Sequence, residues 1–185
     1  MQKNGLQYTS LVKSWTRYQS AMLPNWKEHV SLCSQLIRSH SGELMQTVRS
    51  ASVSQRTMNF CSLTKNLLDV LTIFIPQLTP TSVSKEPDCI LLFIFAATWS
   101  LGGSLDDSGR KQFHYTLQKK FPRVFEHTLF QGGKLIYDVY FSVQKNGIAS
   151  LCSWKVKVPR IIWNSPPSQW HSTVLPTEVR NNYLI

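Results

Sequence analysis

The chain has 185 residues, of which 42% are hydrophobic and 16% are charged, and its formal net charge at pH 7 is +10. This composition excludes a wholly disordered chain, because it supplies enough apolar residues for the core of one ordinary domain or two small ones. The basic residues are scattered along the sequence, and no run of them exceeds two. Nucleic-acid-binding proteins concentrate such residues in one patch or stripe, so the pattern disfavours nucleic acid as a partner.

The cysteines and histidines show no metal-binding or redox spacing. The four cysteines form no C-x-x-C pair, and the five histidines show no H-x-x-x-H spacing. We therefore expect no bound metal, no disulfide framework and a reducing, intracellular compartment. Residues 1–20 are polar and lack the continuous apolar stretch of a signal peptide.

A first amphipathic helix is predicted over residues 7–22. Its apolar positions fall on one helical face and are Leu11, Trp15, Tyr18 and Met22. Pro24 interrupts this helix, and Asn25 followed three residues later by Glu28 has the pattern that caps the start of a second helix.

Two further amphipathic helices are predicted before residue 75. The second helix weakens at Gly42, and the third covers about residues 54–71. Their apolar stripes are Trp26, Val30, Cys33 and Ile37 in the second helix and Phe60, Leu63, Leu67 and Val70 in the third. Because each stripe needs a partner to cover it, residues 5–74 are expected to form a small helical bundle.

Residues 75–88 contain three prolines and several small polar residues, which is typical of a linker. We place a domain boundary in this segment. The uncharged run that follows, Ile90 to Trp99, is too short to span a bilayer, which requires about 20 residues. Asp88, and no basic residue, flanks its amino-terminal side. The run therefore predicts a buried helix that ends at Gly102 and Gly103.

A charged helix is predicted next. Ser104 with Asp107 three residues later has the capping-box pattern that opens a helix. The adjacent carboxylates of Asp106 and Asp107 suit the first turn of that helix better than a metal or acid–base pair. One side of the helix is apolar and the other is basic, with Phe113, Leu117 and Phe121 inside and Arg110, Lys111, Lys119 and Lys120 largely outside.

From Leu135 onward the hydrophobic period changes to two, which predicts a strand over residues 135–143. Asn146 and Gly147 form a typical hairpin turn. A second strand, with Trp154, Val156 and Val158 on one face, is expected to run until Pro159.

The catalytic motifs that the sequence could have carried are absent. A phosphate-binding P-loop needs four residues between its glycines and then a lysine, whereas five residues separate Gly103 from Gly109 and Arg110 takes the place of the lysine. The sequence also has no G-x-S-x-G, H-E-x-x-H or G-x-G-x-x-G motif. By its own residues the chain is therefore not expected to be an enzyme or to hold a cofactor.

The stretch around the glycine pair resembles the start of the third AAA+ unit in the motor ring of dynein heavy chains. The matching positions are Phe95, Trp99, Ser100, Gly102, Gly103, Ser104, Asp106, Arg110, Lys111 and Phe113. Residues 5–15 are similar to the beginning of the small helical subdomain of the second unit, and the matching positions there are Leu6, Val12, Ser14 and Trp15. Residues 134–141 and the hairpin at Trp154 look like the strand pair that the family places next.

The last segment, residues 174–185, looks like the stretch that leads into the third unit's nucleotide site, although it is a residue or two shorter. The resemblance implies that five positions lie beside the bound nucleotide, namely Val174, Pro176, Thr177, Val179 and Arg180.

The resemblance implies a mixed α+β fold with two parts. Residues 5–74 would be the small subdomain of the second AAA+ unit, residues 75–88 a linker, and residues 89–185 the amino-terminal part of the third unit with two helices and a β-hairpin, ending before Walker A. ATP or ADP with magnesium would belong to the intact motor, and microtubules would be reached only through parts that this chain lacks.

The resemblance also implies partners and a location. The partners would be neighbouring AAA+ units and other dynein subunits, and the location would be the cytoplasm and cytoskeleton, with a cilium or flagellar axoneme favoured. The alternative is a stand-alone truncated protein that acts as a non-catalytic partner-binding module. A basic protein bound to membrane or RNA is a third class, which the scattered charge disfavours.

Overall fold

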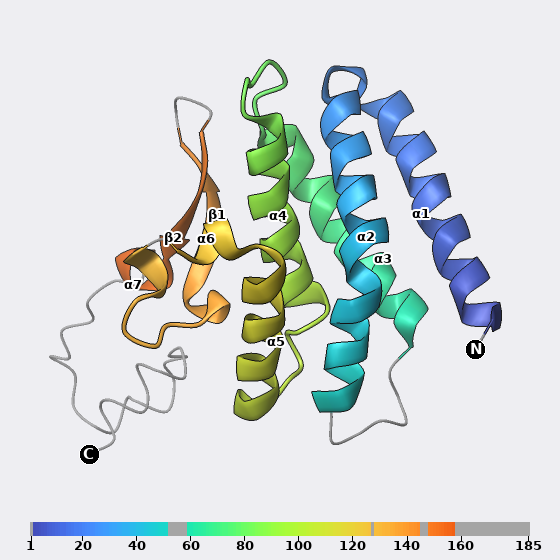
Figure 1. The fold of residues 1–185 in the computed structure, drawn as a ribbon. Coiled ribbons are helices and arrows are strands. Elements are labelled where there is room, and N and C mark those ends of the chain that lie inside the picture. Colours follow the sequence, from blue (N-terminus) through green and yellow to red (C-terminus); the bar gives the residue numbers. More distant parts are fainter. Residues whose placement is uncertain (1, 52–58, 127, 145–147, 158–185) are drawn as a thin grey trace, which may run out of the picture.

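The structure is a computed structural model that describes residues 2–51, 59–126, 128–144 and 148–157. Within these ranges five long helices lie side by side, and a small β-hairpin packs against α4 on the side away from α1 (Figure 1). The amino-terminal elements are α1 (Gln2–Met22), the 3-10 turn η1 (Pro24–Trp26), α2 (Lys27–Ala51), α3 (Phe60–Phe74) and the 3-10 turn η2 (Ile75–Gln77).

The later elements combine two long helices with short turns and two strands. They are α4 (Lys85–Ser100), α5 (Asp107–Lys120), α6 (Pro122–Phe125), η3 (Thr128–Phe130), η4 (Ile136–Asp138), β1 (Val139–Val143), β2 (Ala149–Ser153) and α7 (Trp154–Lys157). The expected mixture of helices with a small sheet is confirmed. No helix in the described ranges is both long and apolar enough to cross a membrane.

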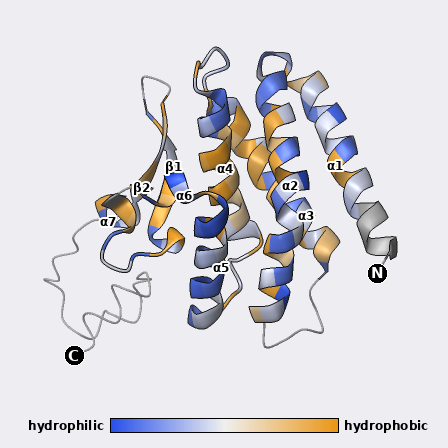
Figure 2. Ribbon diagram, viewed as in Figure 1, coloured by the Kyte–Doolittle hydropathy of each residue, from blue (hydrophilic) through white to orange (hydrophobic). Residues whose placement is uncertain are grey.

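One apolar core runs from α1 to the hairpin, and α4 lies at its centre (Figure 2). The uncharged run predicted as a buried helix is α4, where Leu92, Phe93 and Ile94 are fully buried. The core continues through residues 75–88, because Ile75 and Leu78 are buried there. The assignment of the two sides to two AAA+ units stays a prediction.

The first helix presents a different face to the core from the one that was predicted. Tyr18 and Met22 are each 61% exposed, whereas Val12 and Gln19 are buried. The Trp15 indole N–H donates to Thr72 Oγ1 at 2.9 Å, and the Gln19 amide donates to the same oxygen at 3.2 Å. The helix therefore turns its polar Gln19 toward α3, and the prediction for Tyr18 and Met22 was wrong.

The predicted start of the second helix was also wrong. Asn25 lies inside the turn η1, and α2 begins at Lys27. Glu28 forms an ion pair with Lys85 at the start of α4 instead of completing a cap. The helix passes through exposed Gly42 and continues to Ala51, because its buried residues extend to Val48 and outweigh the propensity of one glycine.

The third helix begins later than predicted. Asn59 caps α3, since its side-chain oxygen accepts a hydrogen bond from the backbone N–H of Cys61 at 3.0 Å. Leu67 is fully buried, while Phe60, Leu63 and Val70 pack against the core as partly buried residues.

The hairpin is shorter than predicted at both of its ends. Asp138 accepts a hydrogen bond from the backbone N–H of Leu135 at 2.7 Å, which holds residues 136–138 in the turn η4, so β1 begins only at Val139. In the register, β1 pairs antiparallel with β2 from Val139↔Ser153 to Val143↔Ala149. Trp154 therefore lies beyond the strand, in the short helix α7, where its ring contacts Tyr140 at 4.8 Å between centroids. The predicted turn at 145–147 and Val158 lie outside the described residues.

Candidate functional site

The residues that carried the family resemblance meet where α4 ends and α5 begins, a region that we call the α4–α5 joint (residues 99–113 together with Tyr137). The backbone N–H of Gly102 donates to the carbonyls of Ala97 (3.3 Å) and Thr98 (3.1 Å), which closes the last turn of α4. A Cβ atom on Gly102 would lie 2.3 Å from Tyr137 Oη, and one on Gly103 would lie 2.6 Å from the carbonyl oxygen of Trp99. Close packing therefore explains both glycines of the joint.

Asp106, and not Ser104, caps the helix that follows. Its Oδ1 accepts a hydrogen bond from the backbone N–H of Gly109 at 2.8 Å, and Ser104 lies outside the helix. The predicted Ser104 capping box was therefore wrong. The predicted first-turn position is confirmed for Asp107, the first residue of α5, whereas Asp106 is the N-cap.

We expect Asp106→Ala to lower the free energy of unfolding by about 1 kcal/mol, because the first turn of α5 loses its side-chain acceptor. Urea denaturation followed by circular dichroism measures this loss. Asp107→Ala removes a carboxylate at the next residue, which does not cap the helix, and should lower the free energy of unfolding by less than half as much. Equal losses in the two variants would contradict the assignment of the cap to Asp106.

The apolar side of α5 is buried as predicted. Phe113 and Leu117 are fully buried, and Phe121 is 9% exposed. Lys111 is exposed, and Lys120 forms an ion pair with Glu43 of α2. The hydroxyl of Ser100 is buried and has no hydrogen-bond partner in the described part of the chain.

Tyr137 joins the joint from a distant part of the sequence. Its hydroxyl donates to the carbonyl oxygen of Gly102 at 3.0 Å, and its ring meets the Trp99 indole edge-to-face at 6.0 Å. The guanidinium carbon of Arg110 lies 5.2 Å from the centre of the same ring. Burial raises the pKa of the Tyr137 phenol, so the group stays protonated and acts as a donor. The sequence indicated only an apolar strand position for this residue.

His114 links α5 to η4. Its Nδ1 accepts a hydrogen bond from the backbone N–H of Ile136 at 3.0 Å, and its ring meets Phe125 edge-to-face at 5.1 Å. Burial lowers the pKa of His114, and the nearby carboxylate of Asp138 opposes that change more weakly. The contact requires the neutral imidazole, because a protonated Nδ1 cannot accept a hydrogen bond.

The chain should become less stable as the pH falls below about 6.5. The pKa values of His29, His40 and His114 are all lowered from 6.5, chiefly by burial, so the unfolded chain takes up protons more readily than the folded chain. Their contribution to stability is complete above pH 6.5 and is lost as the pH falls toward the lowered values. Each histidine can add at most about 1.4 kcal/mol per pH unit to this slope.

The variant His114→Asn tests the part of this slope that belongs to the joint. The amide oxygen of asparagine can still accept from Ile136, but the side chain does not titrate. Urea unfolding between pH 7.5 and 5 should give a shallower pH dependence for this variant than for the unmodified chain. An unchanged slope would contradict a role of His114 in the acid sensitivity.

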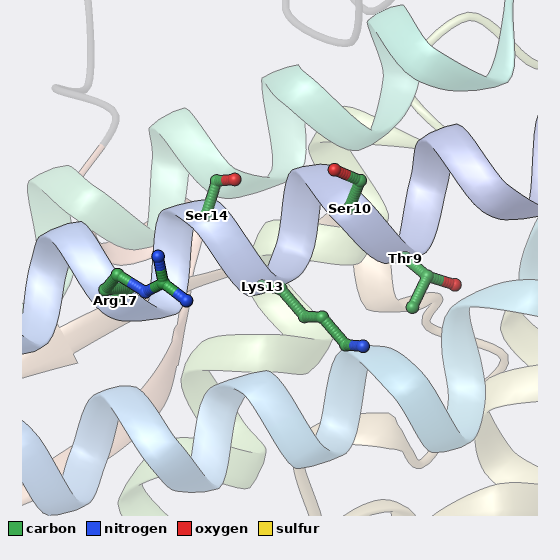
Figure 3. A pocket seen from close by; sticks show the side chains of 5 residues that line it. All are labelled: Thr9, Ser10, Lys13, Ser14 and Arg17. Atoms are coloured by element: carbon green, nitrogen blue, oxygen red, sulfur yellow. The ribbon is translucent and has the colours of Figure 1, made fainter.

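A shallow polar hollow lies on the outer face of α1. Figure 3 shows the side chains that line it, all from this one helix, and they are Thr9, Ser10, Lys13, Ser14 and Arg17. All five are exposed, so the hollow does not remove a ligand from water. Among the described residues, no group of three or more His, Cys, Asp or Glu side chains could hold a metal ion. The α4–α5 joint is therefore the stronger candidate site.

The structure brings most of the predicted motif positions together and leaves others apart. Tyr137 is contacted by Trp99, Gly102 and Arg110, and Gly102 also lies against Phe113. Lys111 is exposed. The predicted nucleotide-adjacent positions lie outside the described residues, and they are Val174, Pro176, Thr177, Val179 and Arg180.

The fold, a set of packed helices with one short hairpin, is consistent with a helical AAA+ lid. The family described as the Dynein heavy chain AAA lid domain matches residues 20–155, which include every long helix except most of α1. The chain belongs to this family.

The chain is also similar to a curated human protein, Dynein axonemal heavy chain 1. The two are 29% identical over 137 residues, a match that covers 69% of this chain and 3% of the human protein. The chain therefore spans a very small part of the relative's length. No solved structure matches the chain.

Proposed function

We propose that the chain is a segment of the motor ring of an axonemal dynein heavy chain. In this proposal, residues 5–74 are the small subdomain of the second AAA+ unit, residues 75–88 connect it to the next unit, and residues 89–185 form the amino-terminal part of the third unit. The segment contributes to ATP-driven, microtubule-based movement as part of the full-length motor, and it carries no catalytic residue of its own.

The match of the lid family across residues 20–155 is the observation that carries the proposal. Because this one match extends over both sides of 75–88, it supports the ring segment as a whole, and the division into two units rests on the sequence resemblance. The similarity to an axonemal heavy chain supports the axonemal location, in a cilium or flagellum. The packed α4–α5 joint adds a physical role, because two glycines, a helix cap and Tyr137 fix the angle at which α5 leaves α4. In this proposal the joint lies within the third unit and holds α5 at a fixed angle to α4 there.

The cofactor and partners follow from the same proposal. ATP or ADP with magnesium is held by the intact motor, with Val174, Pro176, Thr177, Val179 and Arg180 beside the nucleotide. Neighbouring AAA+ units and other dynein subunits contact the segment, and other parts of the motor contact the microtubule.

Titration calorimetry of the chain alone with ATP and magnesium should show no binding, since the sequence has no P-loop lysine.

An immunoblot of isolated axonemes tests the proposal most directly. An antibody raised against the exposed face of α5 should detect a polypeptide far larger than the 21.2 kDa of this sequence, because the human relative is many times longer than the matched segment. Release of that large band from the axoneme by high salt, together with other dynein subunits, is the expected result. A band at about 21 kDa alone would contradict the proposal and would favour a stand-alone module.

A further inference from the structure

Arg110 is a cation that has no anionic partner among the described residues. The residue is half-buried, and no carboxylate in the described ranges forms an ion pair with it. Its Nε is buried and has no hydrogen-bond acceptor among the described residues. A partly desolvated guanidinium gains most from a carboxylate, which accepts two charge-assisted hydrogen bonds from it.

The guanidinium is held in place although no carboxylate of the described residues pairs with it. Its carbon lies 5.2 Å from the centre of the Tyr137 ring, and the hydroxyl of that ring is anchored by its hydrogen bond to Gly102. A cation held over an aromatic face loses less conformational freedom when a ligand binds than a free surface side chain does. Arg110 is thus pre-organised for an acceptor.

Trp99 adds an exposed aromatic surface and a second donor that contacts the same Tyr137 ring as Arg110. Its side chain packs edge-to-face on Tyr137 but is 40% exposed. The indole N–H groups of Trp15 and Trp26 donate to Thr72 and Leu78, whereas the indole N–H of Trp99 has no acceptor within the described chain. Trp, Tyr and Arg are also the residues most enriched among those that dominate protein–protein binding energy.

We propose that Trp99, Arg110 and Tyr137 form a docking site for a carboxylate-bearing segment of a neighbouring AAA+ unit. The inference rests on the proposed function, which supplies the neighbour, and charge complementarity specifies its chemistry. A glutamate or aspartate side chain accepts from the terminal nitrogens of Arg110, and the residue beside it packs on the exposed face of Trp99. Exposed Lys111 lies next to Arg110 in the sequence and adds positive potential to the approach.

Side-chain NMR of the whole chain tests the site without the unknown partner. The six tryptophan indole N–H groups are labelled with nitrogen-15, and the signal of Trp99 is assigned with the variant Trp99→Phe. The probe is the peptide acetyl-Gly-Glu-Gly-amide, and its control is the same peptide with glutamine at constant ionic strength. We expect the Trp99 signal to shift with the glutamate peptide and to saturate at a Kd on the order of 1–10 mM, the range of a single contact.

Substitutions of the two neighbouring cations separate docking from general attraction. Arg110→Met should weaken the peptide about tenfold or more, and Arg110→Lys should recover only part of the affinity, because lysine lacks the planar fork. Lys111→Met keeps the site and should change the affinity less than about twofold, as expected for an exposed charge. Dispersed amide spectra show that each variant is folded.

The proposal is overturned if the Trp99 signal is unmoved by 20 mM peptide, roughly twice the weakest expected Kd. It is also overturned if the glutamine peptide shifts the signal equally, or if Arg110→Met and Lys111→Met lose affinity alike. These outcomes are independent of the axoneme immunoblot. A large heavy-chain band with no peptide response would remove the docking site and leave the ring segment. A 21 kDa band with a specific response would leave a carboxylate-binding site and remove the neighbouring AAA+ unit as its occupant.

Discussion

Gly102→Ala should lower the free energy of unfolding by about 2–3 kcal/mol, since an added methyl group overpacks a closed site. The new Cβ would lie 2.3 Å from Tyr137 Oη and 3.0 Å from the nearest carbon of the Phe113 ring. Tyr137 cannot move without giving up its hydrogen bond to Gly102, and Phe113 is fully buried. Urea denaturation followed by circular dichroism measures the loss.

Gly42 gives a control for this substitution within the same chain. It lies in α2, and a Cβ added there meets nothing within 4 Å. Gly42→Ala should therefore stabilise the chain by about 0.5–1 kcal/mol, the ordinary gain from replacing glycine inside a helix.

A double variant locates the clash at the joint. In Gly102→Ala with Tyr137→Phe, the oxygen that lies closest to the new methyl group is gone. Part of the lost stability should therefore return, compared with the sum of the two single losses. Losses that simply add would show that Tyr137 is not the obstacle, and a neutral Gly102→Ala would contradict the packing of the joint.

Elements governed by local periodicity could be predicted from the sequence. The uncharged run around Phe93 had to be a buried helix, because it is apolar on every side and too short for a membrane. Phe113 and Leu117 followed from helical spacing and are fully buried. Both predictions depended on residues within a few turns of one another.

Features that depend on which elements meet could not be predicted. Tyr18 was expected to be buried but is exposed, and Gln19 is buried instead, because α1 packs against Thr72 of α3. The spacing of residues within one helix carries no information about that partner. The sequence predicted Ser104 as the cap of α5, whereas Asp106, two residues later, accepts the capping hydrogen bond from Gly109.

The candidate site shows the same limit. Its motif positions could be found in one stretch of sequence, but Tyr137 belongs to a later segment that had the pattern of a strand. Only the folded chain brings its hydroxyl to Gly102 and its ring under Arg110. An unpaired arginine is likewise invisible in a sequence, because the absence of a carboxylate is a property of the three-dimensional surroundings.

Phe93→Ala should cost about 3–5 kcal/mol, the range for removing a fully buried aromatic side chain. The Phe93 ring on α4 lies 6.2 Å from the ring of His40 on α2 and 6.1 Å from that of Phe121 after α5. The cavity would therefore open where the elements before and after residues 75–88 meet. Tyr115→Ala on α5 is the control, because a side chain that is 63% exposed should change stability by less than about 0.5 kcal/mol.

Hydrogen exchange of this variant also tests how the two predicted units depend on each other. One shared core means that the amides of α2 and those of α5 lose protection together, by the same free energy, when Phe93 is truncated. Two independently stable units would lose protection only in α4 and α5, and denaturation would show two separate transitions. We expect the first result, because the core is continuous from Val12 to Leu151. Loss of protection confined to α4 and α5 would contradict a single cooperative core.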